Sequence, residues 1–282
     1  MAFGQQLKTA ARAVRVTGWV HFLGLFLLGW AWAGAGHPGA AALGLAASAL
    51  YLSFTFGVNN LYDRGLDPAS KNPFAAGGLS PRAGAVAMAF LAGAGLVFAF
   101  AASPGMGAVF VFMTAASFAY SGPWRMKRFP FWGSFHNALI FGPLFLAGCL
   151  AVRPLALADL AWTVLFSFTV LIVQVAQELS DRAGDAAAGL SGTAIVLGTE
   201  GSLLLIMALS VSRYLFSAAL LHWGMAGWGG VLICFAVSLA ETGWTSLFYY
   251  EVQKGFSKMR LGLRFINMGF GIAMLGLFLQ RL

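Results

Sequence analysis

The stretch GAAALGLAASALYLSFTFGVNNLYDRGLD, residues 39–67, joins a long apolar run to a group of polar side chains. Residues 39–60 contain no charged side chain, and about 20 consecutive apolar residues suffice to cross the hydrocarbon core of a bilayer as a helix. Asn59, Asp63 and Asp67 are spaced by four residues, where the run meets water. The stretch therefore predicts a membrane-spanning helix with an acidic end.

The rest of the chain has the same apolar character. Of its 282 residues, 60% are hydrophobic and only 9% are charged, a balance that excludes an ordinary soluble domain. Cys149 and Cys234 lie inside apolar runs, so we expect them to be buried and unpaired. We expect a single all-α integral membrane domain over residues 1–282, with nine transmembrane helices. The expected spans are 17–35, 39–60, 83–102, 105–121, 132–151, 156–177, 201–221, 225–247 and 262–280.

The distribution of Lys and Arg predicts the topology. Links rich and poor in basic residues alternate along the chain, which places the amino terminus and the even-numbered links in the cytoplasm. The net charge of +8 is spread over these links, so it indicates a multi-pass protein of the cell membrane in contact with lipid, with no nucleic-acid partner. The first span follows Lys8, Arg12 and Arg15 and is similar to a signal peptide. A retained span is the favoured interpretation, because eight further spans follow.

Acidic residues are scarce, yet they gather at two places. Asn59, Asp63 and Asp67 form the first acidic run, and Gln177, Asp181 and Asp185 form the second, with Glu178 beside it. Residues four apart share one face of a helix, where like charges repel each other. Mg²⁺ prefers oxygen ligands and usually binds through one or two carboxylates plus substrate phosphates. The two runs therefore predict a site for Mg²⁺ and a diphosphate, with solvated helix ends as the alternative.

Three basic side chains are candidates for contact with the diphosphate. Lys71 follows the first acidic run, and Arg125 and Lys127 lie in YSGPWRMKRFP, residues 120–130. Topology signalling is the alternative for each of them. We expect the links that carry Lys71 and Arg125 to lie beside the acidic runs.

In these motifs the sequence resembles the UbiA superfamily of intramembrane prenyltransferases. NNLYDRGLD, residues 59–67, is similar to the family's first motif, NDxxDxxxD. DRAGDAAAGLSGTAIVLG, residues 181–198, is similar to its second, and YSGPWRMKRFP resembles the link after the fourth span. The order and spacing of the motifs fit along nearly the whole chain.

The resemblance implies a fold, an activity and a set of site residues. The fold would be nine transmembrane helices around a central cavity, with the active site on the cytoplasmic side. The activity would be Mg²⁺-dependent transfer of a prenyl group from a polyprenyl diphosphate to a lipophilic, usually aromatic, acceptor. The catalytic residues would be Asp63, Asp67, Asp181 and Asp185, and the same aspartates with Asn59 would be the metal ligands. The substrate-binding residues would be Asn59, Asn60, Lys71, Tyr120, Arg125, Lys127, Gln174, Gln177 and Glu178.

The sequence also departs from the family pattern. Asn60 stands where the family commonly has Asp, and Gln174 stands where some members have an acid that Glu178 could replace. The number of metal ions and the exact reaction stay open at this point. A UbiA-type terpene cyclase or carotenoid elongase is the close alternative, and a membrane transporter is the alternative from another class.

A few polar residues lie within the expected spans. Arg213 and Glu241 fall in the seventh and eighth spans, and charges inside a membrane are usually paired or functional. We expect these two to pair within the bundle, with acceptor binding as the alternative. His136 and Asn137 lie at the start of the fifth span. They are interpreted as helix-end residues, with substrate contact as the alternative.

Overall fold

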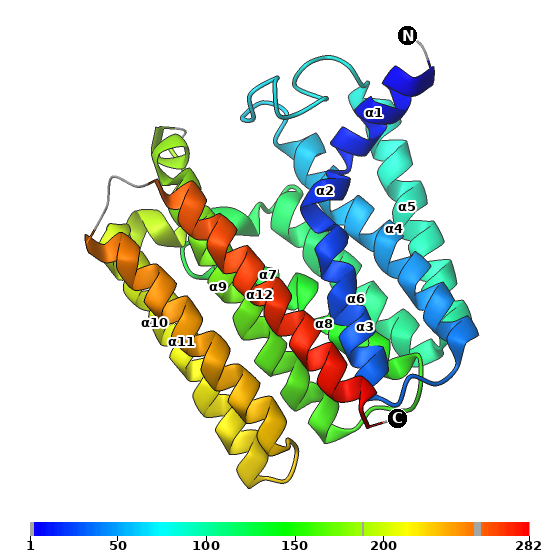
Figure 1. Ribbon diagram of the computed structural model, residues 1–282. Helices are drawn as coiled ribbons and strands as arrows, with labels where there is room; N and C mark the ends of the chain where they lie inside the picture. The colour runs from blue at the N-terminus through cyan, green and yellow to red at the C-terminus, as the bar shows by residue number, and fades with distance from the viewer. Residues whose placement is uncertain (1–2, 188, 251–254, 282) are drawn as a thin grey trace.

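The structure is a computed structural model that describes residues 3–187, 189–250 and 255–281. Helices and turns make up these residues, and no strand occurs among them (Figure 1). The helices are α1 (Phe3–Ala13), α2 (Val16–Trp19), η1 (Val20–Phe22), α3 (Leu23–Trp32), α4 (Pro38–Tyr62), α5 (Pro81–Ala102), α6 (Pro104–Ser121), η2 (Met126–Arg128), α7 (Trp132–Phe141), α8 (Pro143–Leu150), α9 (Leu157–Ala187), α10 (Thr193–His222), α11 (Trp228–Tyr250) and α12 (Phe256–Leu279).

Within the described ranges, nine helical segments are long and apolar enough to cross a membrane, as predicted. The first of them starts earlier than expected, at Lys8, and it bends at Arg15, whose φ of 50° is not helical. The fifth is divided into α7 and α8 at Pro143, because proline lacks the N–H that would continue the helix. The seventh begins at Thr193 rather than at residue 201, and Gly198 kinks it with a φ of 69°.

The fifth span runs through the middle of the bundle and is the most deeply buried of the nine candidate spans. Its halves α7 and α8 pack against α3, α6 and α9, while α12 closes the circle by packing on α9 and α3 (Figure 1). Glycine permits the closest of these contacts. A Cβ at Gly29 of α3 would lie 1.8 Å from the Phe145 carbonyl oxygen, and one at Gly148 of α8 would lie 2.0 Å from that of Phe26. Small residues thus bring α3 and α8 into backbone contact.

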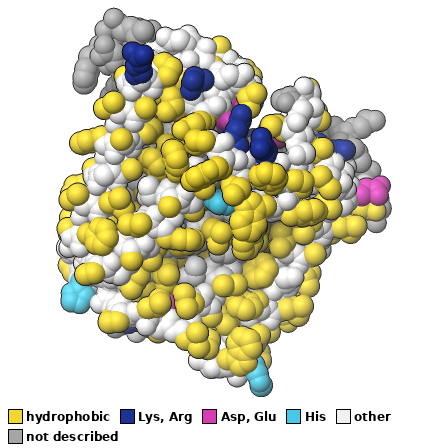
Figure 2. All heavy atoms as spheres, turned by 180° about the vertical axis from the view of Figure 1, so that it is seen from behind, with side chains coloured by type: hydrophobic (Ala, Val, Ile, Leu, Met, Phe, Trp, Pro, Cys, Tyr) yellow, Lys and Arg dark blue, Asp and Glu magenta, His cyan; other side chains and the backbone are white. Residues whose placement is uncertain are grey.

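Polar groups collect at one end of the bundle. With 31 residues at a rise of about 1.5 Å each, α9 is about 46 Å long, whereas the hydrocarbon core is about 30 Å thick. Its last turns therefore extend past the apolar zone, beside the link that follows α4. Figure 2 shows Lys and Arg side chains near this upper end, above a broad hydrophobic surface. The two termini lie at opposite ends of the bundle, as an odd number of spans requires (Figure 1).

The predicted pair inside the bundle is present. Arg213 of α10 and Glu241 of α11 are both fully buried, and their Nη2 and Oε2 atoms lie 2.7 Å apart. The guanidinium of Arg213 also donates to Thr169 and Asn267 and lies over the ring of Phe270. This group ties α9, α10, α11 and α12 together. The two cysteines, Cys149 and Cys234, are buried and unpaired, as expected.

Candidate active site

The first acidic run lies at the end of α4. Helix α4 ends at Tyr62, and Asp63 follows with φ −90° and ψ 6°. The expectation that all three residues share a helical face was therefore wrong for Asp67, which lies in the next turn. The backbone N–H of Asp67 still donates to the carbonyl of Asp63 at 2.9 Å. That bond holds the second carboxylate close to the first.

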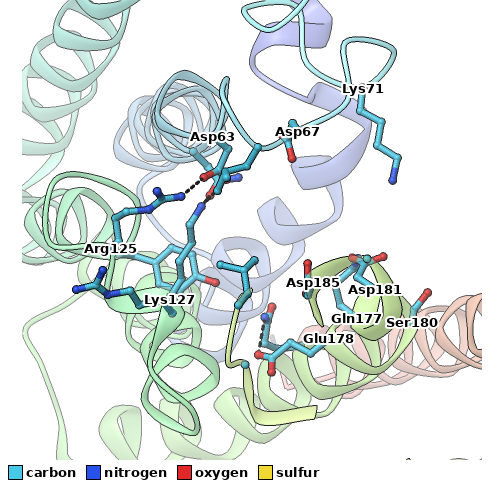
Figure 3. Close-up of a pocket in the computed structure, with 18 of the residues that line it drawn as sticks. Asp63, Asp67, Lys71, Arg125, Lys127, Gln177, Glu178, Ser180, Asp181 and Asp185 are labelled. Atoms are coloured by element: carbon cyan, nitrogen blue, oxygen red, sulfur yellow. Dashed lines mark hydrogen bonds and ion pairs between the residues drawn. The ribbon is translucent and has the colours of Figure 1, made fainter. Parts of the chain in front are cut away.

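The second acidic run stays helical throughout. Gln177, Asp181 and Asp185 all belong to α9, which continues to Ala187. Figure 3 shows Asp181 and Asp185 on one side of a cavity, with Asp63 and Asp67 facing them from the other side. The two runs therefore meet in space, although more than 100 residues separate them in the chain.

The cavity between the runs has a volume of about 580 Å³. Its wall combines both signs of charge, and Lys71 lies beyond Asp67, away from Arg125 and Lys127 (Figure 3). Twelve of the thirteen predicted site residues line it: Asn59, Asp63, Asp67, Lys71, Tyr120, Arg125, Lys127, Gln174, Gln177, Glu178, Asp181 and Asp185.

The thirteenth, Asn60, does not face the cavity. Its side chain is fully buried and donates to the carbonyl of Ala13 at 2.7 Å. Its own carbonyl accepts from the side chain of Asn72 at 2.7 Å. Adjacent residues of a helix point in directions about 100° apart, so Asn59 and Asn60 cannot both face the cavity. Asn60 instead attaches α1 to the end of α4, and its prediction as a substrate-binding residue does not match this placement.

Basic side chains from the link after α6 contact the first acidic run. Lys127 donates from Nζ to Oδ1 of Asn59 at 2.8 Å and also to Oδ2 of Asp63. Arg125 donates to Oδ1 of Asp63 at 3.2 Å. Burial lowers the pKa of Lys127 below its ordinary value, and the carboxylate of Asp63 opposes that shift. Both oxygens of Asp63 are thus engaged by cations.

Asp67 is held by two further donors. Arg15 forms an ion pair with its Oδ2 at 3.0 Å, and Asn72 donates to the same oxygen at 3.1 Å. Neither residue was predicted at the site. Arg15 was counted among the basic residues before the first span, and Asn72 lies in the loop after Asp67. The bend at Arg15 brings that side chain to Asp67, and no local sequence pattern signals such a contact.

The second acidic run has looser partners. Gln177 donates to Oδ2 of Asp181 and accepts from Arg264 at 3.2 Å. Arg260 of α12 lies 3.8 Å from Oδ1 of Asp181. Within the part of the chain that the structure describes, the carboxylate of Asp185 makes no hydrogen bond or ion pair. The second run is therefore the more open of the two.

Glu178 of α9 is hydrogen-bonded to two neighbouring helices. Its Oε1 accepts from the hydroxyl of Ser134 at 2.6 Å and from Gln174 at 3.1 Å, and its Oε2 accepts from the backbone N–H of Ala194 at 3.4 Å. Ser134 also lies 2.7 Å from the hydroxyl of Thr193, at the start of α10. These bonds join α7, α9 and α10 beside the cavity, so Glu178 fixes the walls as well as lining them.

Tyr120 is the aromatic side chain that lines the cavity among the described residues. Its hydroxyl accepts a hydrogen bond from Asn137 at 2.9 Å. His136 is buried, with its Nε2 2.8 Å from the carbonyl oxygen of Ala116 and its ring 5.7 Å from that of Tyr120. His136 and Asn137 therefore support the Tyr120 ring from behind and do not line the cavity themselves.

The donor set suits a hard divalent cation. Each run offers two carboxylates, and carboxylate and amide oxygens are the ligands that Mg²⁺ accepts. Among the described residues, no three His, Cys, Asp or Glu side chains are close enough together to form a ready-made metal cage. Mg²⁺ ordinarily completes its coordination with water and substrate phosphates, so paired carboxylates on facing walls fit a metal that bridges to a phosphate.

A second hollow of about 640 Å³ adjoins the first and shares Asp67, Lys71, Gln177, Ser180 and Asp181 with it. Its remaining wall comes from the first span, from the start of α12 and from Ser70 in the loop after α4. Three arginines contribute there: Arg12, Arg15 and Arg260. The two hollows thus adjoin as one polar region, which is acidic where the runs face each other and basic toward the first span and α12.

Comparisons with known proteins show the family and the fold. The model of the UbiA prenyltransferase family matches residues 17–268. A UbiA homolog from Archaeoglobus fulgidus, solved bound to DMAPP and Mg²⁺, is 21% identical, with a TM-score of 0.75 over 95% of this chain and 99% of that one. Among curated proteins, none matches the sequence significantly.

Two further solved structures share the fold. A digeranylgeranylglyceryl phosphate synthase is 16% identical, with a TM-score of 0.78 over 98% of this chain and 99% of that one. A UbiA homolog from Aeropyrum pernix K1 is 17% identical, with a TM-score of 0.67 over 90% and 96%.

Proposed function

The chain belongs to the UbiA prenyltransferase family, and we propose that it transfers the prenyl group of a polyprenyl diphosphate to a lipophilic, electron-rich acceptor with the help of Mg²⁺. The observation that carries the proposal is the facing pair of acidic runs. Asp63 and Asp67 lie across one cavity from Asp181 and Asp185, with cations beside them. The structures of the Archaeoglobus fulgidus homolog bound to DMAPP or GPP with Mg²⁺ support the same substrate class.

The acidic runs and the basic side chains would bind the diphosphate in different ways, through the metal and directly. Asn59, Asp63, Asp67, Asp181 and Asp185 would hold Mg²⁺, which when bound neutralises the charge that develops on the departing diphosphate. Arg125 and Lys127 on one side, and Lys71 beyond Asp67, would bind phosphate oxygens directly. Donors that are already in place at the developing charge contribute most to such a step.

The ring of Tyr120 provides the next element of the site. When the C–O bond to the diphosphate breaks, an allylic carbocation forms, and an aromatic face stabilises a cation by cation–π attraction. Tyr120 is held by Asn137 at the inner wall of the cavity, where the prenyl carbon would lie once its diphosphate is bound. The acceptor then forms the new bond to that carbon and loses a proton.

The proposed membrane orientation follows from charge. The site end of the bundle carries the acidic runs together with Lys71, Arg125, Lys127 and Arg260, whereas Arg153 lies at the opposite end, paired with Asp159. By the positive-inside rule this distribution supports an active site and an amino terminus on the cytoplasmic side. Arg64→Cys at the site end and Arg281→Cys at the opposite end test this orientation by labelling intact cells with a membrane-impermeant maleimide. Labelling of position 281 and not of position 64 is the expected result.

Product analysis tests the proposed reaction. Purified protein is incubated with geranylgeranyl diphosphate, Mg²⁺ and a panel of aromatic and lipid acceptors, and the products are identified by mass spectrometry. A prenylated acceptor supports the proposal. A cyclised hydrocarbon, formed without any acceptor, would show instead that the same diphosphate site serves a cyclase.

A further inference from the structure

We propose that Lys127 and Arg125 act as place-holding cations on the first acidic run, which accepts a divalent metal only when a diphosphate group draws both side chains away. The inference rests on the proposed function and concerns the order in which that site is filled. It implies that metal and diphosphate bind together at the first run, and that metal alone binds there weakly.

The contacts of the first run carry the inference. Lys127 bridges Asn59 and Asp63, and Arg125 binds the remaining oxygen of Asp63. The side chains of Lys127 and Asp63 are only 17% and 11% exposed, so water screens their interaction weakly. Three oxygens that would ligate the metal are therefore already bound by cations, as the dashed lines in Figure 3 show for Asp63.

A lysine ammonium and a divalent cation cannot share these oxygens at low cost. Both are positive, and at a separation of a few ångströms in a partly buried site water screens their mutual repulsion only weakly. The metal must therefore displace Lys127 or remain outside. A diphosphate offers the displaced ammonium and guanidinium new anionic partners, so its arrival lowers the cost of releasing Asp63.

The second run differs in this respect. The carboxylate of Asp185 has no hydrogen bond or ion pair within the described residues. The carboxylate of Asp181 accepts from the neutral amide of Gln177, and its ion pair with Arg260 is 3.8 Å long. Its carboxylates can accept a metal without first losing a short ion pair to a lysine. The two runs are alike in sequence, yet in the structure the carboxylates of the first run are more closely paired with cations than those of the second.

Metal binding without turnover tests the inference. Mn²⁺ replaces Mg²⁺ at oxygen sites, and free Mn²⁺ is measured by electron paramagnetic resonance in the presence of purified protein and no substrate. Lys127→Met removes the ammonium from Asn59 and from one oxygen of Asp63 together, while the hydroxyl of Ser121 still donates to Oδ1 of Asn59 at 3.1 Å. We expect it to raise the Mn²⁺ affinity at this site by roughly tenfold, as removal of a competing charged hydrogen bond allows.

Three further variants isolate the cause. Arg128→Met removes the same charge from the same link, but Arg128 lies over the ring of Phe129 and makes no ion pair with an acid in the described structure, so it should change the affinity much less. Lys127→Arg keeps a cation and should stay near the wild type, which also controls for folding. In an Asp63→Asn background, Lys127→Met should give no gain, because the freed oxygens no longer form an anionic ligand.

The diphosphate completes the test. With a poorly reacting thiolodiphosphate analogue of geranyl diphosphate present, the wild type should bind more Mn²⁺. The difference in Mn²⁺ affinity between the wild type and Lys127→Met should then become smaller. Equal or weaker Mn²⁺ binding by Lys127→Met without the analogue would overturn the inference and leave the proposed function standing. Failure of every variant to bind Mn²⁺, with or without the analogue, would overturn both.

Discussion

Replacing Arg213 with methionine should destabilise the protein by about 3 kcal/mol, because it leaves the carboxylate of Glu241 buried without its counter-charge. Glu241 is fully buried and receives two bonds from Arg213, at 2.7 and 3.3 Å, and one from Ser210 at 2.7 Å. Only the Ser210 bond survives the substitution. Breaking a buried pair typically costs about 3–5 kcal/mol, and the lower end applies here because hydrogen bonds in membrane bundles are worth less than expected.

The double variant distinguishes a pair from two independent residues. Arg213→Met with Glu241→Leu removes both charges, and we expect it to lie within about 1 kcal/mol of the wild type, since an apolar replacement of a buried pair is often neutral. The assay is reversible unfolding in mixed micelles with increasing SDS. Single variants that each lose less than about 1 kcal/mol, or a double variant that loses the sum of both, would refute the reasoning.

Three smaller changes test other parts of the structure. Gly29→Ala should lower the stability by at least about 2 kcal/mol, because its Cβ would meet the backbone oxygen of Phe145 at 1.8 Å. Gly24→Ala, with open space around it, should be tolerated. Thermal unfolding in detergent compares the two variants. Glu178→Gln should lower kcat/KM about tenfold by loosening the α7–α9–α10 contact, and steady-state kinetics would show unchanged values if that contact were dispensable. Asn60→Ala should cost about 1 kcal/mol by detaching α1 without changing KM for the diphosphate, and a raised KM would return Asn60 to the substrate site.

Much of the fold could be predicted because membrane spans are defined by composition. Runs such as 39–60 and 83–102 agree with α4 and α5 to within a few residues at each end, since polarity changes sharply where a chain leaves the bilayer. The least accurate boundaries lie where helices continue into water. Helix α9 extends ten residues past the predicted end at residue 177, because its polar last turns carry no apolar signal.

The candidate site could be predicted as a set of residues but not as a set of contacts. The spacing of Asp181 and Asp185 placed them on one helical face, and α9 confirms it. The orientation of Asn60 was missed because an Asn next to a ligand position looks the same in sequence whether it faces a cavity or a neighbouring helix. The pairing of Arg15 with Asp67 depends on a bend and on a loop, which only the folded chain defines.

The charged pair inside the bundle could be predicted because acidic residues are rare in this chain. Only nine acidic residues occur in the chain, so a Glu and an Arg within adjacent spans are expected to form an ion pair. The fully buried Arg213–Glu241 contact confirms that expectation. Its position among four helices supports a structural role for the pair.

The measurement that tests the central claim most directly is diphosphate release from geranylgeranyl diphosphate by purified wild-type protein, with and without Mg²⁺, beside Asp63→Asn and Asp181→Asn. Glu200→Gln, which neutralises an exposed acid outside both hollows, is the matched control. Release that requires Mg²⁺, falls at least a hundredfold in both aspartate variants and persists in the control is the expected result, since a loss of about 2.7 kcal/mol of transition-state stabilisation corresponds to that factor. Release that is independent of Mg²⁺, or equal in all four proteins, would contradict the assignment of the facing acidic runs as the diphosphate site.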